Sequence, residues 1–306
     1  MRSKMLVPSK ELVEAARGAG YAVGAFNAVN METAQAIFAA AEREKSPLII
    51  QVTQTTMAYT EPEDVAAVIF SLAERATIPV AVHLDHGRSF GIVMRFLKMG
   101  FTSVMIDGSL QEDGKTPRTY EENVEVTRRV IEAAKSLGVS VEAEIGRLGQ
   151  IGEDASTALT EPDEAAKFVK DIAVDGVGID MLAVAIGTRH GLFKGKPIIR
   201  SDRVKELSDR LDMPLVMHGG TGVPDEDVRK AIEAGMCKVN IDTQIRVAFY
   251  HALRDVVEKQ EKEYAAADAA GETRRYDIRK IIAPTRDAMT EAIAEKMRLF
   301  GSAGNA

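Results

Sequence analysis

Eight short apolar runs recur along the chain, and segments with helical periodicity lie between them. The runs begin near residues 21, 47, 78, 101, 138, 178, 213 and 237 and read YAVGAFN, PLIIQVT, IPVAVHL, FTSVMID, GVSVEAEI, GIDMLAVAI, MPLVMHG and CKVNID. Segments such as METAQAIFAAAEREK carry apolar residues at the spacing of an amphipathic helix. Apolar strands separated by helices predict a parallel sheet covered on both faces.

Eight such β/α units predict an α/β fold of the closed (β/α)8 kind, a TIM barrel. An open, doubly wound sheet is the alternative, with its ligand where the strand order reverses. Polar residues follow nearly every run, which favours the barrel. Residues from about 245 to 306 predict a C-terminal helical extension that is too short to be a separate domain. We therefore expect a single barrel domain over residues 1–306.

Composition excludes several functional classes. The net charge of −7 has both signs interspersed and forms no basic stripe, so we expect no nucleic-acid or membrane partner. The single cysteine, Cys237, excludes a disulfide-based secreted fold and lies in a predicted buried strand. The N-terminus lacks the apolar region of a signal peptide, and no run reaches membrane-spanning length. These features predict a cytoplasmic location.

Polar residues stand at the end of every apolar run, and the carboxyl ends of barrel strands converge on one face. We expect the following residues to meet there: Asn27, Thr53, Asp85, His86, Asp107, Ser109, Glu144, His190, His218, Asn240 and Asp242.

Three of the five histidines, His86, His190 and His218, stand at such ends, each followed by glycine. A lone histidine there is more often a hydrogen-bonded rim residue. Three that converge are what a catalytic zinc ion needs, with a fourth position open. His83 has the parity of an interior residue, and His251, inside a predicted helix, is expected to be structural.

Glycine-rich turns beside two of these histidines predict an anion site. RHGLFKGK and HGGTGV place glycines where backbone amides can approach a phosphate, and HGGTGVPDEDV runs into a helix N-terminus. Lys194 and the Thr221 hydroxyl are predicted helpers. A phosphate site after the seventh and eighth strands is frequent in this fold.

With these residues assembled, the sequence resembles the class II, metal-dependent ketose-bisphosphate aldolases, which include the fructose- and tagatose-bisphosphate aldolases. The motifs that carry the resemblance span nearly the whole chain: GYAVGAFNAVNMETAQAI, IPVAVHLDHG, GFTSVMIDGS, VEAEIGRLG, LAVAIGTRHG, PLVMHGGTGVP, KVNIDT, YDIRK and LFGSAG.

The resemblance implies a role for each matching residue. His86, His190 and His218 would bind Zn2+ or another divalent ion, with Glu144 as a carboxylate near the metal; a monovalent cation is compatible with the family. Asp85 would exchange a proton with the C4 hydroxyl, and a carboxylate that only orients a histidine is the alternative. Glu153, or its neighbour Asp154, would handle the C3 proton. The implied phosphate-binding residues are Gly191, Lys194, Gly219, Gly220, Thr221, Asn240, Asp242 and Thr243, with Asn27 and Thr53 also at the substrate and Arg279 at the far phosphate.

Two stretches depart from the family pattern in ways that touch specificity. VTQTTMAY puts Gln54, Thr55 and Thr56 where the family often has glycine, and LQEDGKTPRTYEEN lengthens the loop after the fourth strand. Fructose 1,6-bisphosphate is the first expected substrate and tagatose 1,6-bisphosphate the second, followed by a phosphorylated ketose with another distal anion, such as sulfofructose 1-phosphate. The family commonly forms dimers or tetramers, which implies a homo-oligomer.

Two alternatives come from other functional classes. A barrel metal hydrolase would usually carry an early His-x-His pair, which HLDH does not match. The other is a non-catalytic phosphosugar-binding protein or scaffold, which an unchanged turnover rate in a metal-binding Asp85→Ala variant would favour. A Schiff-base aldolase lacks a candidate lysine, because Lys238 lies inside its strand rather than at its end.

Overall fold

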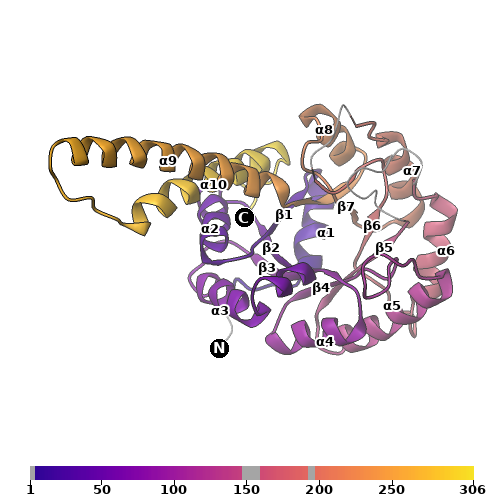
Figure 1. Cartoon of the computed structure of the whole chain (residues 1–306). Coiled ribbons are helices and arrows are strands. Elements are labelled where there is room, and N and C mark those ends of the chain that lie inside the picture. Colours follow the sequence, from indigo (N-terminus) through magenta and orange to yellow (C-terminus); the bar gives the residue numbers. More distant parts are fainter. Residues whose placement is uncertain (1–3, 147–158, 192–196) are drawn as a thin grey trace.

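The computed structural model describes residues 4–146, 159–191 and 197–306. Eight parallel strands, hydrogen-bonded in chain order, close into a barrel in which β8 pairs with β1, as predicted (Figure 1). The strands are β1 Val23–Asn27, β2 Leu48–Thr53, β3 Val80–Gly87, β4 Ser103–Ile106, β5 Ser140–Ile145, β6 Met181–Val184, β7 Leu215–Met217 and β8 Met236–Ile241.

Helices between successive strands form the outer layer of the barrel (Figure 1). They are α2 Met31–Glu44, α3 Pro62–Ala73, α4 Phe90–Met99, α5 Tyr120–Lys135, α6 Pro162–Ile172, α7 Ser201–Leu211 and α8 Asp225–Glu233, with a short 3-10 helix, η1 Gln54–Ala58, after β2. Each turns an apolar stripe to the sheet; on α2 this stripe includes Ile37, Phe38 and Ala41. Asn30 and Thr33 form a reciprocal capping box that fixes where α2 begins.

The end of the barrel opposite the carboxyl ends of the strands is closed by α1, Ser9–Ala19. Its buried residues Leu12, Val13 and Ala16 pack in one apolar cluster with inward-facing residues of the strands, including Cys237 of β8. The prediction that Cys237 is buried in a strand is confirmed. Because one end is plugged, the only polar, hollowed end of the barrel is the one formed by the carboxyl ends of the described strands.

Above this apolar plug the barrel interior becomes polar. His83 of β3 is fully buried and its Nδ1 lies 2.7 Å from Oγ of Ser103, so its predicted interior position is confirmed. Glu142 of β5 and Lys238 of β8 are also fully buried and pair at 2.8 Å. Lys238 lies inside its strand, as predicted, and its amine is held by this carboxylate. Such a pair is costly to separate, because either partner alone would leave a buried charge.

The C-terminal extension consists of α9, Thr243–Ala269, and α10, Ile278–Leu299. The two helices lie side by side and project from the barrel as an arm, which we call the α9–α10 arm, and α10 returns to pack on α2 and β1 (Figure 1). His251, predicted to be structural, lies on α9 with an exposed side chain against the ring of Tyr250. In the described part of the chain, no helix is both long and apolar enough to cross a bilayer.

Candidate active site

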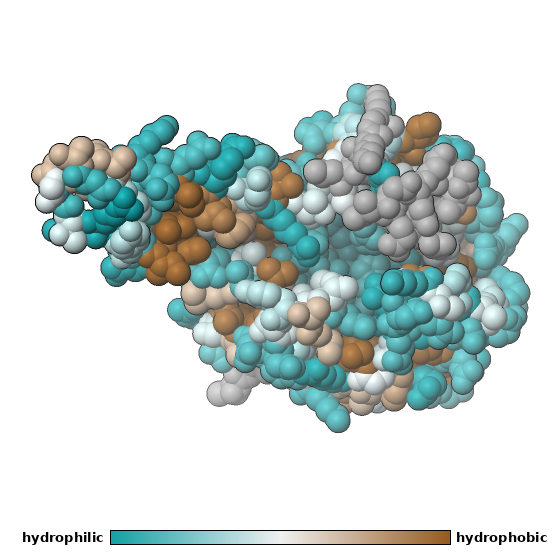
Figure 2. All heavy atoms as spheres, in the orientation of Figure 1, coloured by the Kyte–Doolittle hydropathy of each residue, from teal (hydrophilic) through white to brown (hydrophobic). Residues whose placement is uncertain are grey.

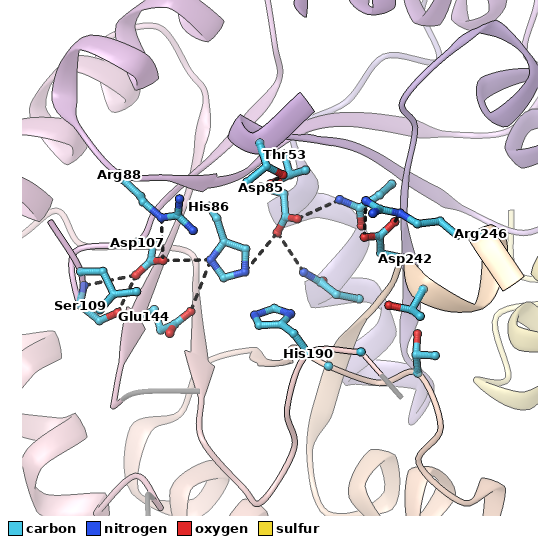
Figure 3. Close-up of a pocket in the computed structure, with 18 residues that line it drawn as sticks. Thr53, Asp85, His86, Arg88, Asp107, Ser109, Glu144, His190, Asp242 and Arg246 are labelled. Carbon is cyan, nitrogen blue, oxygen red and sulfur yellow. Dashed lines mark hydrogen bonds and ion pairs between the residues drawn. The ribbon is translucent and has the colours of Figure 1, made fainter. Parts of the chain in front are cut away.

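A pocket opens at the carboxyl ends of the strands (Figure 3). The sequence-predicted residues that line it are Asn27, Thr53, Asp85, His86, Asp107, Ser109, Glu144, His190, Gly191, Gly219, Thr221, Asn240, Asp242 and Thr243. Residues from all eight strand ends therefore share one cavity. Four further residues that line the pocket had no individual prediction: Thr55, Arg88, Leu110 and Arg246.

Three imidazole rings meet at the floor of this pocket. One ring nitrogen from each of His86, His190 and His218 lies within 4.8 Å of the others. Nε2 of His86 is 3.0 Å from Nδ1 of His218, and the ring centroids of His86 and His190 are 5.1 Å apart. The structure thus brings the three predicted ligands to one point.

The backbone at the end of β3 is bent to present His86. His86 has a left-handed backbone with φ 51°, which is uncommon for a residue with a side chain, and the pairing of β3 with β4 shifts register between Leu84 and Gly87. A Cβ on Gly87 would come 2.8 Å from the carbonyl oxygen of Met105. Glycine is therefore required next to this histidine for a local steric reason.

The ring orientations of the histidines are fixed by carboxylates behind them. Nε2 of His218 donates to Oε1 of Glu142 at 2.8 Å, and the other oxygen of Glu142 accepts from Lys238. Nδ1 of His86 lies 3.1 Å from Oδ2 of Asp107. These contacts leave Nδ1 of His218 and Nε2 of His86 turned toward each other, which is the arrangement a shared cation needs.

Asp85 lies beside this centre and is held by two carboxamides. Its Oδ2 accepts from Asn27 at 2.9 Å and its Oδ1 from Asn240 at 3.2 Å, while Oδ1 is 3.9 Å from Nε2 of His86. Burial by itself raises the pKa of Asp85, but the positive charge of His86 and the other cationic neighbours outweigh burial and lower it. Asp85 is therefore a carboxylate at neutral pH, fixed in orientation next to the three rings.

The three histidines differ in proton affinity. Burial opposes a charge on His86, yet the carboxylates of Asp85, Asp107 and Glu144 outweigh it and raise the pKa of His86 to about 10. Burial, followed by the charge of His86, lowers the pKa of His190 to about 4 and also lowers that of His218. In the protein without metal, one proton is thus held between His86 and His218 at neutral pH.

Glu144 indicates that a cation belongs in this cluster. Its Oε2 is buried, finds no hydrogen-bond donor among the residues described, and lies 3.9 Å from Nδ1 of His86. Burial, and then the negative charge of Asp107, raise the pKa of Glu144. A buried carboxyl oxygen without a protein partner is usually satisfied by an ordered water or an ion. Three imidazole nitrogens with a nearby carboxylate form a donor set that fits a divalent metal ion.

Metal binding is expected to release a proton. A divalent ion that binds Nε2 of His86 must displace the proton held there, because the pKa of that ring is about 10. His190 and His218 are already neutral at pH 7 and release none. Zinc affinity should therefore rise by up to about tenfold per pH unit from pH 7 toward 9. Calorimetric titrations in buffers of different ionisation enthalpy measure this, and a pH-independent affinity would contradict the assignment.

Several residues of the predicted anion cradle lie in or beside the same pocket. Gly219, with φ 67°, and Gly220 are packed so closely that a Cβ on either would collide with the backbone of Arg189 or with Val239. Thr221 and Thr243 line the pocket, and α9 begins at Thr243. Free backbone amides at a helix N-terminus favour an anion.

Three predicted site residues lie elsewhere or outside the described ranges. Arg279 is 87% exposed, pairs with Asp277 at 2.9 Å and does not line the pocket of its own chain. Glu153 and Lys194 lie outside the described residues. Their assigned roles remain predictions.

Several polar residues of the site had no role assigned from the sequence. Glu142, which orients His218, lies in the middle of an apolar run, where only its alternation with Glu144 gives a signal. Arg246 lies one helical turn after Asp242 and pairs with it at 2.7 Å, a spacing that can be read from the sequence. Arg88 directly follows HG, and only the fold shows that its side chain enters the pocket.

Comparisons with known proteins agree with this architecture. The sequence profile of the class-II fructose-bisphosphate aldolase family matches residues 7–305. A fructose-bisphosphate aldolase of Thermus caldophilus is 40% identical over 99% of this chain and 100% of its own length. A sulfofructosephosphate aldolase of Alkalicoccus urumqiensis is also 40% identical, over 98% of both chains. Among solved structures, the YdjI aldolase of Escherichia coli K12 superposes with a TM-score of 0.83 at 32% identity, over 98% of this chain and 99% of that one.

Proposed function

The chain belongs to the class-II fructose-bisphosphate aldolase family, and on this premise we propose that it cleaves fructose 1,6-bisphosphate reversibly to dihydroxyacetone phosphate and glyceraldehyde 3-phosphate. The family is one of metal-dependent lyases, so aldol cleavage takes precedence over the barrel hydrolase and the non-catalytic sugar-phosphate binder. The observation that carries the proposal is the cluster of three imidazoles beside Asp85. The carboxylate of Asp85 is held by two carboxamides, and its Oδ1 lies 3.9 Å from Nε2 of His86.

We assign Zn2+ to His86, His190 and His218, with Glu144 nearby. The assignment is supported by the convergence of the three ring nitrogens and by the unpartnered oxygen of Glu144. Imidazole nitrogens suit zinc, and a three-histidine set leaves a coordination position open for substrate. A bound divalent ion supplies Lewis-acid stabilisation of negative charge at the ketone oxygen of the substrate.

Asp85 is the proposed base in cleavage. It accepts the proton of the C4 hydroxyl while the C3–C4 bond breaks, and the electron pair of that bond passes into the enediolate of the ketone half. The carboxylate is ionised at neutral pH, which is the state a base requires. Protonation of the enediolate at C3 then yields dihydroxyacetone phosphate, and by resemblance Glu153 is the donor.

The ketone phosphate is proposed to bind in the cradle of Gly191, Gly219, Gly220, Thr221, Asn240, Asp242 and Thr243, with Lys194 as a helper by resemblance. The proposal is supported by the tight glycine backbone and the start of α9 at this place. Burial raises the pKa of Asp242 in spite of its pairing with Arg246.

Tagatose 1,6-bisphosphate and sulfofructose 1-phosphate are the alternative substrates. The second is favoured by one observation, the relative named a sulfofructosephosphate aldolase, which is as similar to this chain as the fructose-bisphosphate aldolase reported above. All three ketoses share the 1-phosphate half and differ at C4 or at the distal anion.

We also infer a cytoplasmic homo-oligomer, a dimer or a tetramer. The inference is supported by large apolar side chains exposed on the α9–α10 arm, namely Tyr250, Val257, Tyr276 and Ile278. Figure 2 shows apolar side chains gathered on one side of this arm.

Release of dihydroxyacetone phosphate tests the function. Zinc-loaded protein should release it from fructose 1,6-bisphosphate, lose the activity after chelation and regain it when Zn2+ is restored. The same assay with the other two ketoses ranks the substrates. Undiminished release from metal-free protein would rule out the metal mechanism, and no release from any of the three would rule out the proposed function.

A further inference from the structure

Arg88 is a cation in the pocket to which the proposed reaction gives no role. It directly follows β3, and its side chain lines the pocket with 20% of its surface exposed. Its Nε is buried and has no hydrogen-bond acceptor among the described residues; Oδ2 of Asp107 is 4.0 Å away. A guanidinium with unused donors that faces a polar pocket can bind an anion there.

The other candidate arginines are already committed to carboxylates. Arg246, also in the pocket, donates from Nε and Nη2 to both oxygens of Asp242 at 2.8 and 2.7 Å. Arg279 pairs in the same two-point way with Asp277 and is exposed outside the pocket. Arg88 therefore has the capacity for a new anion that these two lack.

The position of Arg88 is held by two neighbouring loops. Its backbone N–H donates to Oε1 of Gln54 at 2.9 Å, and its carbonyl oxygen accepts from Nη2 of Arg118 at 2.7 Å. Its guanidinium lies against Gly114, where an added Cβ would come 2.6 Å from Nη1.

These neighbours come from the two stretches that depart from the family pattern. Gln54 belongs to VTQTTMAY after β2, and Gly114 and Arg118 belong to the long loop after β4. The departures are far apart in sequence, yet both contact the same arginine. Both departures therefore shape the surroundings of one side chain in the pocket.

The location of Arg88 suits the distal end of a substrate. Figure 3 shows Arg88 and Arg246 on opposite sides of His86, with Asp85 between them. The proposed phosphate cradle includes Asp242, which lies on the Arg246 side. A ketose that rests its 1-phosphate there and reacts beside Asp85 extends its remaining carbons away from the cradle, toward Arg88.

We propose that Arg88 is the specificity-determining residue that binds an anionic group, phosphate or sulfonate, at the aldehyde end of the substrate. The proposal rests on the proposed function and deepens it: the enzyme selects ketose 1-phosphates that carry a second anion. Charge-assisted hydrogen bonds from a guanidinium discriminate strongly against an uncharged end.

The test compares substrates in the zinc-loaded Arg88→Met enzyme. We expect kcat/KM to fall about 10- to 100-fold for fructose 1,6-bisphosphate or sulfofructose 1-phosphate, mainly through KM, and less than about threefold for fructose 1-phosphate, which lacks the distal anion. Arg88→Lys should recover part of the loss. The larger loss identifies whether phosphate or sulfonate is the preferred group.

Arg95→Met is the matched control, because Arg95 on α4 pairs with Glu61 and Glu63 outside the pocket. It should leave all three rates unchanged. An equal loss of Arg88→Met on every substrate, or a loss of bound zinc, would overturn the proposal and assign Arg88 to Asp107 and the metal site. No loss on any substrate would also overturn it. If the wild type cleaves none of the ketoses, the proposed function fails instead.

Discussion

Replacement of His86 by asparagine is expected to abolish tight zinc binding and to lower kcat/KM by about 10³-fold or more, because the proposed ion would no longer be held where it would stabilise negative charge on the substrate. Asparagine is the suitable replacement. It tolerates the left-handed backbone at this position, φ 51°, better than alanine does, so the end of β3 can keep its shape. Metal content by atomic emission and cleavage rates on the same sample measure both effects.

His251→Asn is the matched control for this variant. Its side chain is exposed on α9, away from the pocket, so metal content and rate should equal those of the wild type. A His86→Asn enzyme that keeps stoichiometric zinc at nanomolar affinity and full activity would remove His86 from the proposed ligand set.

Asp85→Asn is expected to lower kcat by about 10²- to 10⁴-fold while zinc remains bound. The replacement keeps the size of the side chain but cannot accept the C4 proton. It also leaves one of the two amide donors, Asn27 or Asn240, without a carboxylate oxygen to bind. KM should change less than kcat, since the loss falls on the transition state.

The control for Asp85→Asn is Asp209→Asn on α7, where the side chain is exposed and does not line the pocket. It removes the same charge outside the site and should leave kcat unchanged. If Asp85→Asn turned over normally with zinc bound, Asp85 would be a residue that orients the centre without exchanging a proton.

The barrel could be predicted from sequence because most of its strands lie in largely apolar runs separated by helical segments. Runs such as PLIIQVT are mostly apolar and are therefore expected to be buried. Helices between successive runs favour parallel pairing. The predicted ends of the strands were less accurate. MPLVMHG yields only Leu215–Met217 as β7, because His218 turns toward the rings and Gly219 adopts a left-handed backbone. GIDMLAVAI yields only Met181–Val184, because Asp180 bonds to the backbone and side chains of its neighbours instead.

The interior network could not be predicted, because its partners are distant in sequence. Glu142 and Lys238 are 96 positions apart, and each looks like an isolated charge in an apolar run. Only closure of the barrel brings them together. The three histidines were predictable because each stands at a strand end and the fold alone implies that such ends converge. Arg88 was not, since its place depends on two irregular loops.

The separation of the proposed ligands along the chain has a consequence for biosynthesis. His86 lies at the end of β3, His190 follows β6 and His218 directly follows β7. During synthesis on the ribosome, the growing polypeptide contains only His86 of these three residues until more than half of the protein is made. His218 is added only after the seventh strand. Zinc bound by the proposed ligands would therefore protect the finished barrel from unfolding and proteolysis, but the three-histidine site would not exist during the early steps of its assembly.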